Sequence, residues 1–182
     1  MRNQYEIRGD TVAIFLTRND GTKLETLVDS AVLQKVTAFP NTWFATWSPS
    51  TNSFYSISQV SSAPGQKTTV SLHRLITECP ATLYVDHVNH DTLDNRLKNL
   101  RLVSQDQNMQ NRQYANRNSR SGVRCVWWEP DRRKWRAMIR VRGRRIDAGR
   151  FENLIDAEEA VKVAIAKHMP FSLEAAKELP AQ

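Results

Sequence analysis

A short central stretch of the sequence combines residue types that can hold a metal ion and move a proton. Asp86 and His87 stand side by side, a loop rich in Asn and Asp follows, and Asn108 lies further along the chain. A carboxylate and an amide oxygen are hard ligands that suit Mg²⁺ or Mn²⁺. An imidazole with a pKa of about 6.5 can take a proton from water at neutral pH. These residues predict hydrolytic chemistry that depends on one divalent ion.

The surrounding pattern predicts a β-β-α unit that would position these groups. Asp86 and His87 are expected on a short strand, where neighbouring side chains point to opposite faces. Residues 100–103 are expected to form a second strand. Ser104 can then cap a helix that carries Asn108. In this arrangement Asp86 and Asn108 converge on the metal, while His87 faces the substrate.

The stretch from Leu72 to Arg112 resembles the HNH nuclease family, in particular the phage-type HNH homing endonucleases. The motifs that carry the resemblance are, in chain order, L-H-R, V-D-H, D-N-R, N-L-R and Q-N. His90 stands where the family pattern usually has glycine, and His tolerates a positive φ better than most residues.

The resemblance implies a role for each polar residue of the stretch. His87 would be the general base, Asn99 would tie the loop between the two strands, and Asp86 with Asn108 would bind the metal. Three further side chains can either hold phosphates or pair with nearby aspartates: Arg74, Arg96 and Arg101.

The first 70 residues predict a small β-rich module. Strands are expected at residues 4–17 and 22–28, joined by the turn signal Asn19-Asp20-Gly21, with two more strands around Ser48-Pro49-Ser50. Asp29 can cap a short helix after the second of these strands.

The net charge of the chain lies in one segment. Residues 118–155 carry 11 basic and 4 acidic side chains, a net charge of +7, which equals the charge of the whole protein. A solvated surface would spread this charge, so its concentration indicates a polyanionic partner. A polar stretch precedes the segment, and its Arg112 and Arg117 can follow a phosphate backbone.

The basic segment predicts three strands and one helix. The strands are expected at residues 123–128, 134–141 and 145–151, and Asp156 is expected to cap the helix. The middle strand alternates two kinds of side chain. One face carries Arg136, Met138, Arg140 and Arg142, and the other carries Trp135, Ala137, Ile139 and Val141. An arginine-bearing sheet can enter the major groove of DNA.

The segment from Ser121 to His168 resembles the APETALA-type (ethylene-response-factor) DNA-binding domain, through G-V-R, Trp128, K-W-R-A-x-I, G-R-F and the A-E-E-A helix. The resemblance implies base contacts from the exposed sheet face, which map onto Arg124, Trp128, Arg140 and Arg145. The alternative is a generic basic sheet that binds RNA.

The sequence predicts an α+β fold built from separate parts. They are a β-rich N-terminal module (residues 1–70), an HNH-type ββα-metal nuclease unit (71–112), a basic polar linker (113–121), an APETALA-type DNA-binding domain with a three-stranded antiparallel sheet packed on one helix (122–170) and a C-terminal tail (171–182).

The sequence also limits the setting of the protein. Cys79 and Cys125 are far apart and lack a C-x-x-C partner, so no structural zinc is expected. We expect no membrane span and no secretory signal, and a monomer in the cytoplasm of a prokaryotic host, with a phage origin open.

The predicted function is that of a site-specific, metal-dependent endonuclease acting on double-stranded DNA. Whether it nicks one strand or cuts both is left open. The alternative is a sequence-specific DNA-binding regulator with an inactive nuclease unit.

Overall fold

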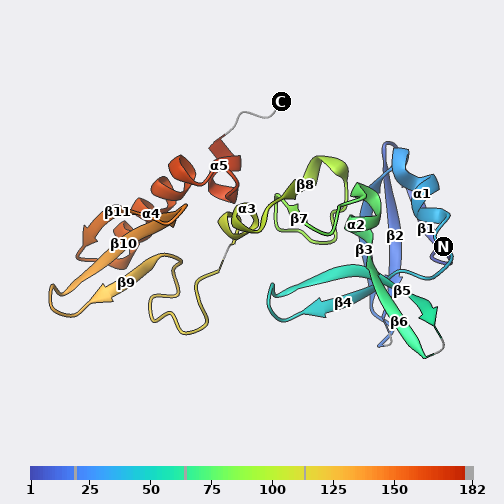
Figure 1. The fold of residues 1–182 in the computed structure, drawn as a ribbon, viewed down its shortest axis with the longest axis horizontal. Coiled ribbons are helices and arrows are strands. Elements are labelled where there is room, and N and C mark those ends of the chain that lie inside the picture. The colour runs from blue at the N-terminus through green and yellow to red at the C-terminus, as the bar shows by residue number, and fades with distance from the viewer. Residues whose placement is uncertain (19, 64, 113, 179–182) are drawn as a thin grey trace. The chain divides into compact units, whose positions relative to one another are not determined.

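The chain folds into two compact units, Met1–Ser104 and Gln105–Gln182. The structure is a computed structural model that describes residues 1–18, 20–63, 65–112 and 114–178 (Figure 1). The fold is mixed α/β, and its strands form several small antiparallel sheets. Among the residues described, no helix has the length and apolar character needed to cross a membrane.

The first sheet of the first unit has the strand order β1-β2-β3, with β1 at Tyr5–Arg8, β2 at Thr11–Thr17 and β3 at Lys23–Asp29. The single strand expected at residues 4–17 is therefore wrong. Gly9 adopts a φ of 63° between β1 and β2, a conformation that glycine reaches without a steric penalty, and the chain turns there. Of the next turn, Asn19 lies outside the described residues, and Asp20 Oδ1 accepts a hydrogen bond from Thr22 N at 2.9 Å.

A second sheet follows, with the order β4-β5-β6. Its strands are β4 at Phe44–Ser48, β5 at Ser53–Ala63 and β6 at Gln66–Ser71. Short helices flank it, namely η1 at Ser30–Val32, α1 at Leu33–Thr37 and α2 at Leu72–Thr77. Asp29 is the N-cap residue of η1, at the predicted position, but its side chain makes no capping hydrogen bond and instead accepts one from Leu97 N at 2.6 Å.

One hydrophobic core serves the whole first unit. Its buried residues are Val12, Ile14, Leu16, Val28, Val36, Trp43, Leu72 and Ile76. Leu72 and Ile76 come from the segment expected to be a separate nuclease unit, and Leu93 and Leu100 of that segment also pack against the core. Residues 1–70 and 71–104 therefore share their packing.

A two-stranded sheet completes the first unit, with β7 at Tyr84–His87, the 3₁₀ turn η2 at Leu97–Asn99 and β8 at Leu100–Val103. The loop between the two strands lies along the edge strand β3. Leu27 N donates to Leu93 O at 2.9 Å, and Asn95 N donates to Leu27 O at 2.8 Å. The loop is thus hydrogen-bonded to the N-terminal sheet.

The second unit begins with α3 at Gln105–Gln110. Its sheet has the order β9-β10-β11, with β9 at Val126–Glu129, β10 at Lys134–Val141 and β11 at Arg144–Phe151. Two helices follow, α4 at Leu154–His168 and α5 at Leu173–Glu178. Buried Ala157, Val161 and Ile165 of α4 pack in one core with Ala137 and Ile139 of β10.

The predicted helix cap at Asp156 is wrong, because the N-cap lies three residues earlier. Asn153 is the N-cap, and its Oδ1 accepts a hydrogen bond from Asp156 N at 2.8 Å. Asp156 instead lies in the first turn, where negative charge is favourable.

Candidate active site

His87 is the last residue of strand β7, and its side chain is buried among others, with 5% of its surface exposed. Its Nε2 lies 3.3 Å from Asn95 Oδ1. Its ring also meets two others edge to face, at 5.3 Å from His73 and 6.1 Å from Tyr55 between ring centroids. Burial lowers the pKa of His87, and the hydrogen bond to Asn95 and nearby aspartates oppose that shift. The imidazole is therefore neutral at neutral pH.

Asp86 precedes His87 on the same strand and faces β8. Its Oδ2 accepts hydrogen bonds from Arg101 Nε at 2.8 Å and from Arg101 Nη2 at 2.7 Å, and the two residues are register partners across the β7–β8 pair. Arg101 thereby fixes the position of one carboxylate oxygen. The sequence left open whether Arg101 holds a phosphate or pairs with an aspartate. The structure shows pairing, and the partner is Asp86.

Asn99 connects both ends of the loop that separates β7 from β8. Its Oδ1 accepts from Asn89 N at 3.0 Å, and its Nδ2 donates to Asp94 O at 2.8 Å. His90 adopts a φ of 64° in the same loop, the conformation that a glycine would otherwise supply. The loop is therefore held by hydrogen bonds from a buried amide.

The other two arginines of this stretch also make contacts within the protein. Arg96 binds Asp94 through Nε and Nη2, both at 2.7 Å, and this pairing lowers the pKa of Asp94 against the effect of burial. Arg74 donates to the carbonyl oxygens of Leu83, Cys79 and Pro80. Arg74 thus holds the backbone between α2 and β7, whereas Arg96 holds a carboxylate of the loop between β7 and β8.

Asn108 lies on α3, which belongs to the second unit. Arg124 holds the end of this helix, because its guanidinium donates to the carbonyl oxygens of Met109, Gln110 and Arg112. The donors of Arg124 are thus used on the backbone of the segment that carries Asn108, and its assignment to base contacts stays a prediction.

The donor chemistry of the expected ligands fits a hard divalent cation. Asp86 offers a carboxylate and Asn108 an amide oxygen, and Mg²⁺ needs only one or two protein carboxylates because it keeps several waters. Within the described part of the chain, no group of three or more His, Cys, Asp or Glu side chains is placed to hold a metal.

The arginine face of the second sheet is partly neutralised. Arg136 pairs with Glu129 at 2.9 Å and with Asp147 at 3.0 Å, and Arg150 pairs with Glu129 at 2.6 Å. The arginine contacts lower the pKa of Glu129, whereas the pKa of Asp147 is lowered first by the hydrogen bond from Gly149 N and then by the two arginines. Arg136, expected to bind DNA, is thus engaged in a network within the sheet.

The tryptophan on that face is Trp127. It is the register partner of Arg136, whose guanidinium lies 5.7 Å from its ring centroid. Trp128 is the register partner of Trp135 and meets its ring at 5.1 Å, so it lies on the opposite face. The register of β9 thus turns Trp127 toward the arginines, and the assignment of Trp128 to DNA contact stays a prediction.

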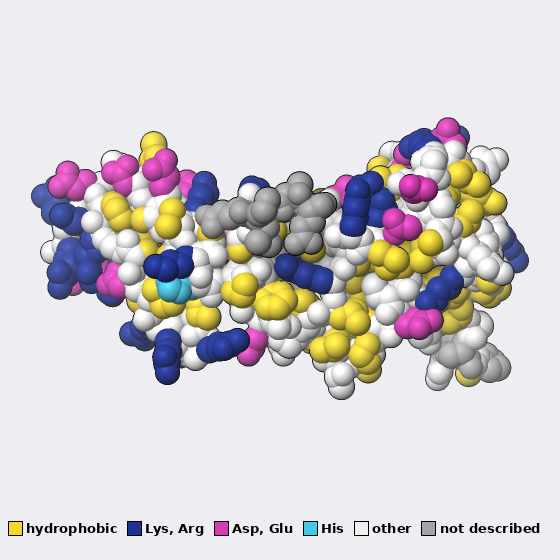
Figure 2. All heavy atoms as spheres, turned by 90° about the horizontal axis from the view of Figure 1, so that it is seen from above, with side chains coloured by type: hydrophobic (Ala, Val, Ile, Leu, Met, Phe, Trp, Pro, Cys, Tyr) yellow, Lys and Arg dark blue, Asp and Glu magenta, His cyan; other side chains and the backbone are white. Residues whose placement is uncertain are grey.

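The remaining predicted DNA-binding residues are exposed: Arg112, Arg117, Arg140, Arg142 and Arg145. Arg140 and Arg145 are register partners on β10 and β11, and Arg142 lies in the turn between the strands. Figure 2 shows Lys and Arg side chains gathered over the second unit, at the left of the view, with acidic side chains among them.

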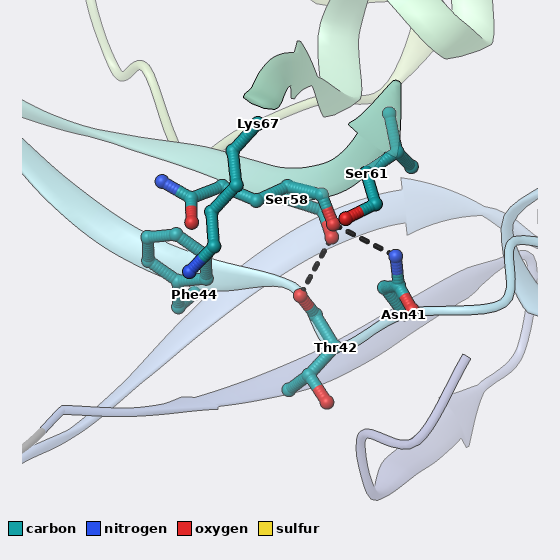
Figure 3. Close-up of a pocket in the computed structure, with 8 residues that line it drawn as sticks. Asn41, Thr42, Phe44, Ser58, Ser61 and Lys67 are labelled. Atoms are coloured by element: carbon teal, nitrogen blue, oxygen red, sulfur yellow. Dashed lines mark hydrogen bonds between the residues drawn. The ribbon is translucent and has the colours of Figure 1, made fainter. Parts of the chain in front are cut away.

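A separate hollow of about 400 Å³ lies in the first unit, lined by Asn41, Thr42, Phe44, Ser58, Gln59, Val60, Ser61 and Lys67. Figure 3 shows that Ser58 and Asn41 are hydrogen-bonded across it to the backbone, Ser58 Oγ to Thr42 O at 2.8 Å and Asn41 Nδ2 to Gln59 O at 2.7 Å. Its lining contains no His, Asp, Glu or Cys, so it lacks a general base.

Comparison with known families supports the first of these sites. The family model described as HNH endonuclease matches residues 72–110, which include Asp86, His87, Asn99 and Asn108. The match indicates a nuclease. Comparison with curated proteins and with solved structures gives no match. The resemblance of residues 122–170 to APETALA-type domains stays a prediction.

Two residues of the hydrogen-bond chain that ends at His87 were not predicted from the sequence: Asn95, which contacts the ring, and Thr26, which is bonded to Asn95. Asn95 belongs to the D-N-R motif, so the motif itself could have pointed to it. Thr26 lies 61 positions before His87 in β3 and carries no chemical signal in the sequence.

Proposed function

We propose that this protein is a site-specific, divalent-metal-dependent DNA endonuclease of the homing or phage type. The observation that carries the proposal is the HNH endonuclease match over residues 72–110, the segment in which a buried, neutral His87 stands beside Asp86. In this proposal β7, β8 and α3 act as the ββα-metal unit.

His87 is the general base. Its neutral imidazole takes a proton from water, the resulting hydroxide attacks the phosphorus, and the bond from phosphorus to the leaving 3′ oxygen breaks. The lowered pKa of His87 keeps the ring unprotonated at neutral pH and so available for this proton. Asn99 keeps the loop beside the base in place through the hydrogen bonds to Asn89 and Asp94.

Asp86 and Asn108 are the residues that would hold one Mg²⁺ or Mn²⁺. The ion supplies charge neutralisation at the scissile phosphate when it is bound. Arg101 orients Asp86 through the two hydrogen bonds to Oδ2. Arg124 holds the end of the helix on which Asn108 lies, so it is a positioning residue.

The second unit provides most of the binding to double-stranded DNA. Residues 1–104 carry 10 basic and 9 acidic side chains, whereas residues 105–182 carry 16 and 10. Association with a polyanion follows positive charge. The exposed residues Arg140, Arg142 and Arg145, with Arg112 and Arg117 before the sheet, are the side chains that we assign to it.

Supercoiled plasmid tests this proposal. The purified protein should convert it to the nicked or linear form with Mg²⁺ or Mn²⁺, and EDTA should stop the reaction. The ratio of nicked to linear product shows whether one or both strands are cut. Tight binding to plasmid without conversion under any metal would contradict the proposal and favour a DNA-binding regulator.

A further inference from the structure

A buried chain of hydrogen bonds runs from the N-terminal sheet to the ring of His87. Thr26 Oγ1 on β3 bonds to Leu93 O at 2.8 Å, Asn95 Nδ2 bonds to Thr26 Oγ1 at 2.7 Å, and Asn95 Oδ1 lies 3.3 Å from His87 Nε2. Thr26 and Asn95 are 0% and 1% exposed. The chain therefore lies away from solvent, where each polar group needs a partner.

The donor and the acceptor of each hydrogen bond in this chain follow from the bond between Thr26 and the Leu93 carbonyl. A backbone carbonyl can only accept, so Leu93 O takes the single hydroxyl proton of Thr26. The Thr26 oxygen must then accept its other bond from Asn95, which turns the amide NH₂ toward Thr26. The second contact of Asn95 Nδ2, to Leu93 O at 3.4 Å, requires the same orientation.

The orientation of the Asn95 amide decides the tautomer of His87. With its NH₂ turned to Thr26, Asn95 presents Oδ1 to the ring, and that oxygen only accepts. His87 Nε2 must therefore carry the hydrogen, and Nδ1 carries the lone pair that can take a proton. A neutral histidine has one donor and one acceptor nitrogen, so fixing one nitrogen fixes the other.

We propose that Thr26 of the N-terminal sheet sets the base-competent tautomer of His87 through Asn95. The inference rests on the proposed function for its catalytic consequence, and it gives the N-terminal sheet a part in the reaction. Thr26 and Asn95 are positioning residues, because they act through His87. Backbone hydrogen bonds beside them, from Leu27 N to Leu93 O and from Asn95 N to Leu27 O, keep the loop in register with β3.

The tautomer can be observed directly in the full-length protein labelled with ¹⁵N-histidine. Long-range ¹H–¹⁵N correlation spectra distinguish a protonated from an unprotonated ring nitrogen, and a His87→Gln variant assigns the signal among the four histidines. We expect protonated Nε2 and unprotonated Nδ1 at neutral pH in the wild type. A protonated Nδ1 there would overturn the inference without any variant.

Two variants at position 26 distinguish the effect of the Thr26 hydroxyl group from the effect of the shape of the side chain. Thr26→Val keeps the shape and removes the hydroxyl, so the Asn95 amide loses its shorter orienting hydrogen bond and retains only the 3.4 Å contact with Leu93 O. We expect a mixture of His87 tautomers and a kcat for plasmid nicking about tenfold lower, with KM unchanged, as loss of one orienting hydrogen bond implies. Thr26→Ser retains the hydroxyl and should restore both. Thermal unfolding shows whether each variant is folded.

The results separate this inference from the proposed function. A wild-type protein with the expected tautomer but no cleavage would overturn the endonuclease proposal and support the proposed control of the His87 tautomer. A Thr26→Val protein that is folded and keeps both the wild-type tautomer and the wild-type kcat would overturn the proposed role of Thr26. It would leave the endonuclease proposal unaffected.

Discussion

His73 and His87 meet edge to face, with 5.3 Å between ring centroids and 86° between ring planes. Burial, with the charges of His87 and Arg74, lowers the pKa of His73 to about 3. Both rings are therefore neutral at neutral pH, and a proton on one would destabilise a proton on the other. This relationship between α2 and β7 makes the stability of the first unit depend on pH.

Stability should fall as the pH drops from 7 to 5. His73 has a folded-state pKa of about 3, below the ordinary value of 6.5, so over this window the unfolded chain binds a proton that the folded chain does not. Each pH unit below 6.5 costs about 1.4 kcal/mol of unfolding free energy for such a group. The lowered pKa of His87 acts in the same direction.

Urea unfolding at pH 7, 6 and 5 measures this effect, with His73→Phe as the comparison. The variant should show a shallower dependence on pH. Asp94 does not interfere, because a carboxyl group with a lowered pKa loses its contribution only below its ordinary pKa of 3.8. An equal pH dependence in both proteins would contradict the assignment to His73.

Removing the proposed base should abolish cleavage and spare binding. His87→Ala should lower the rate of plasmid nicking by about 10²–10⁴-fold, the usual contribution of a general base. His168→Ala is the matched control, because His168 lies in the last turn of α4 in the other unit. Binding is followed by fluorescence anisotropy with labelled duplex. Cleavage by clean His87→Ala protein at the wild-type rate would refute the role of His87.

Removing the proposed metal carboxylate should abolish metal-dependent cleavage. Asp86→Ala should stay inactive when Mg²⁺ is raised well above the concentration that saturates the wild type, since the remaining amide ligand is neutral. Asp20→Ala is a control, because this aspartate pairs with Arg18 at an exposed turn. Recovery of full activity at high Mg²⁺ would show that Asp86 is dispensable.

Two arginines on one face of β10 should differ in their effect on DNA binding. Arg140→Ala should reduce the slope of log K against log salt by about one if it contacts phosphate, or cost about 1–3 kcal/mol at one base position if it reads a base. Arg136→Ala should lower thermal stability more than affinity, because Arg136 is paired with Glu129 and Asp147. Competition between specific and random duplexes separates these outcomes, and an equal salt slope for both variants would contradict them.

The sequence predicted the local structure where pattern and motif agree. The alternation of residues 134–141 is that of β10, and residues 100–103 are β8. It failed where a single residue sets a boundary. Gly9 divides the expected first strand, and Asn153 replaces Asp156 as a cap.

Partners distant in the sequence could not be predicted from it. Thr26 has an ordinary place in an alternating strand, and only the fold brings it to Asn95. In the same way, nothing in the basic segment shows that Arg124 and Arg136 use their donors within the protein. Charge composition predicts where a polyanion would bind but not which side chains remain to contact it.

The shared core of the first unit has a consequence for how such a nuclease can be exchanged or engineered. The segment that matches the family, residues 72–110, contributes Leu72 and Ile76 to a core otherwise built from residues before it. A transplant of that segment alone would carry only two of the eight buried core residues, and its catalytic loop would lose its hydrogen bonds to strand β3. A portable nuclease therefore needs residues 1–104 for its interior and α3 for Asn108, so fusion junctions belong beyond Gln110 rather than near residue 70.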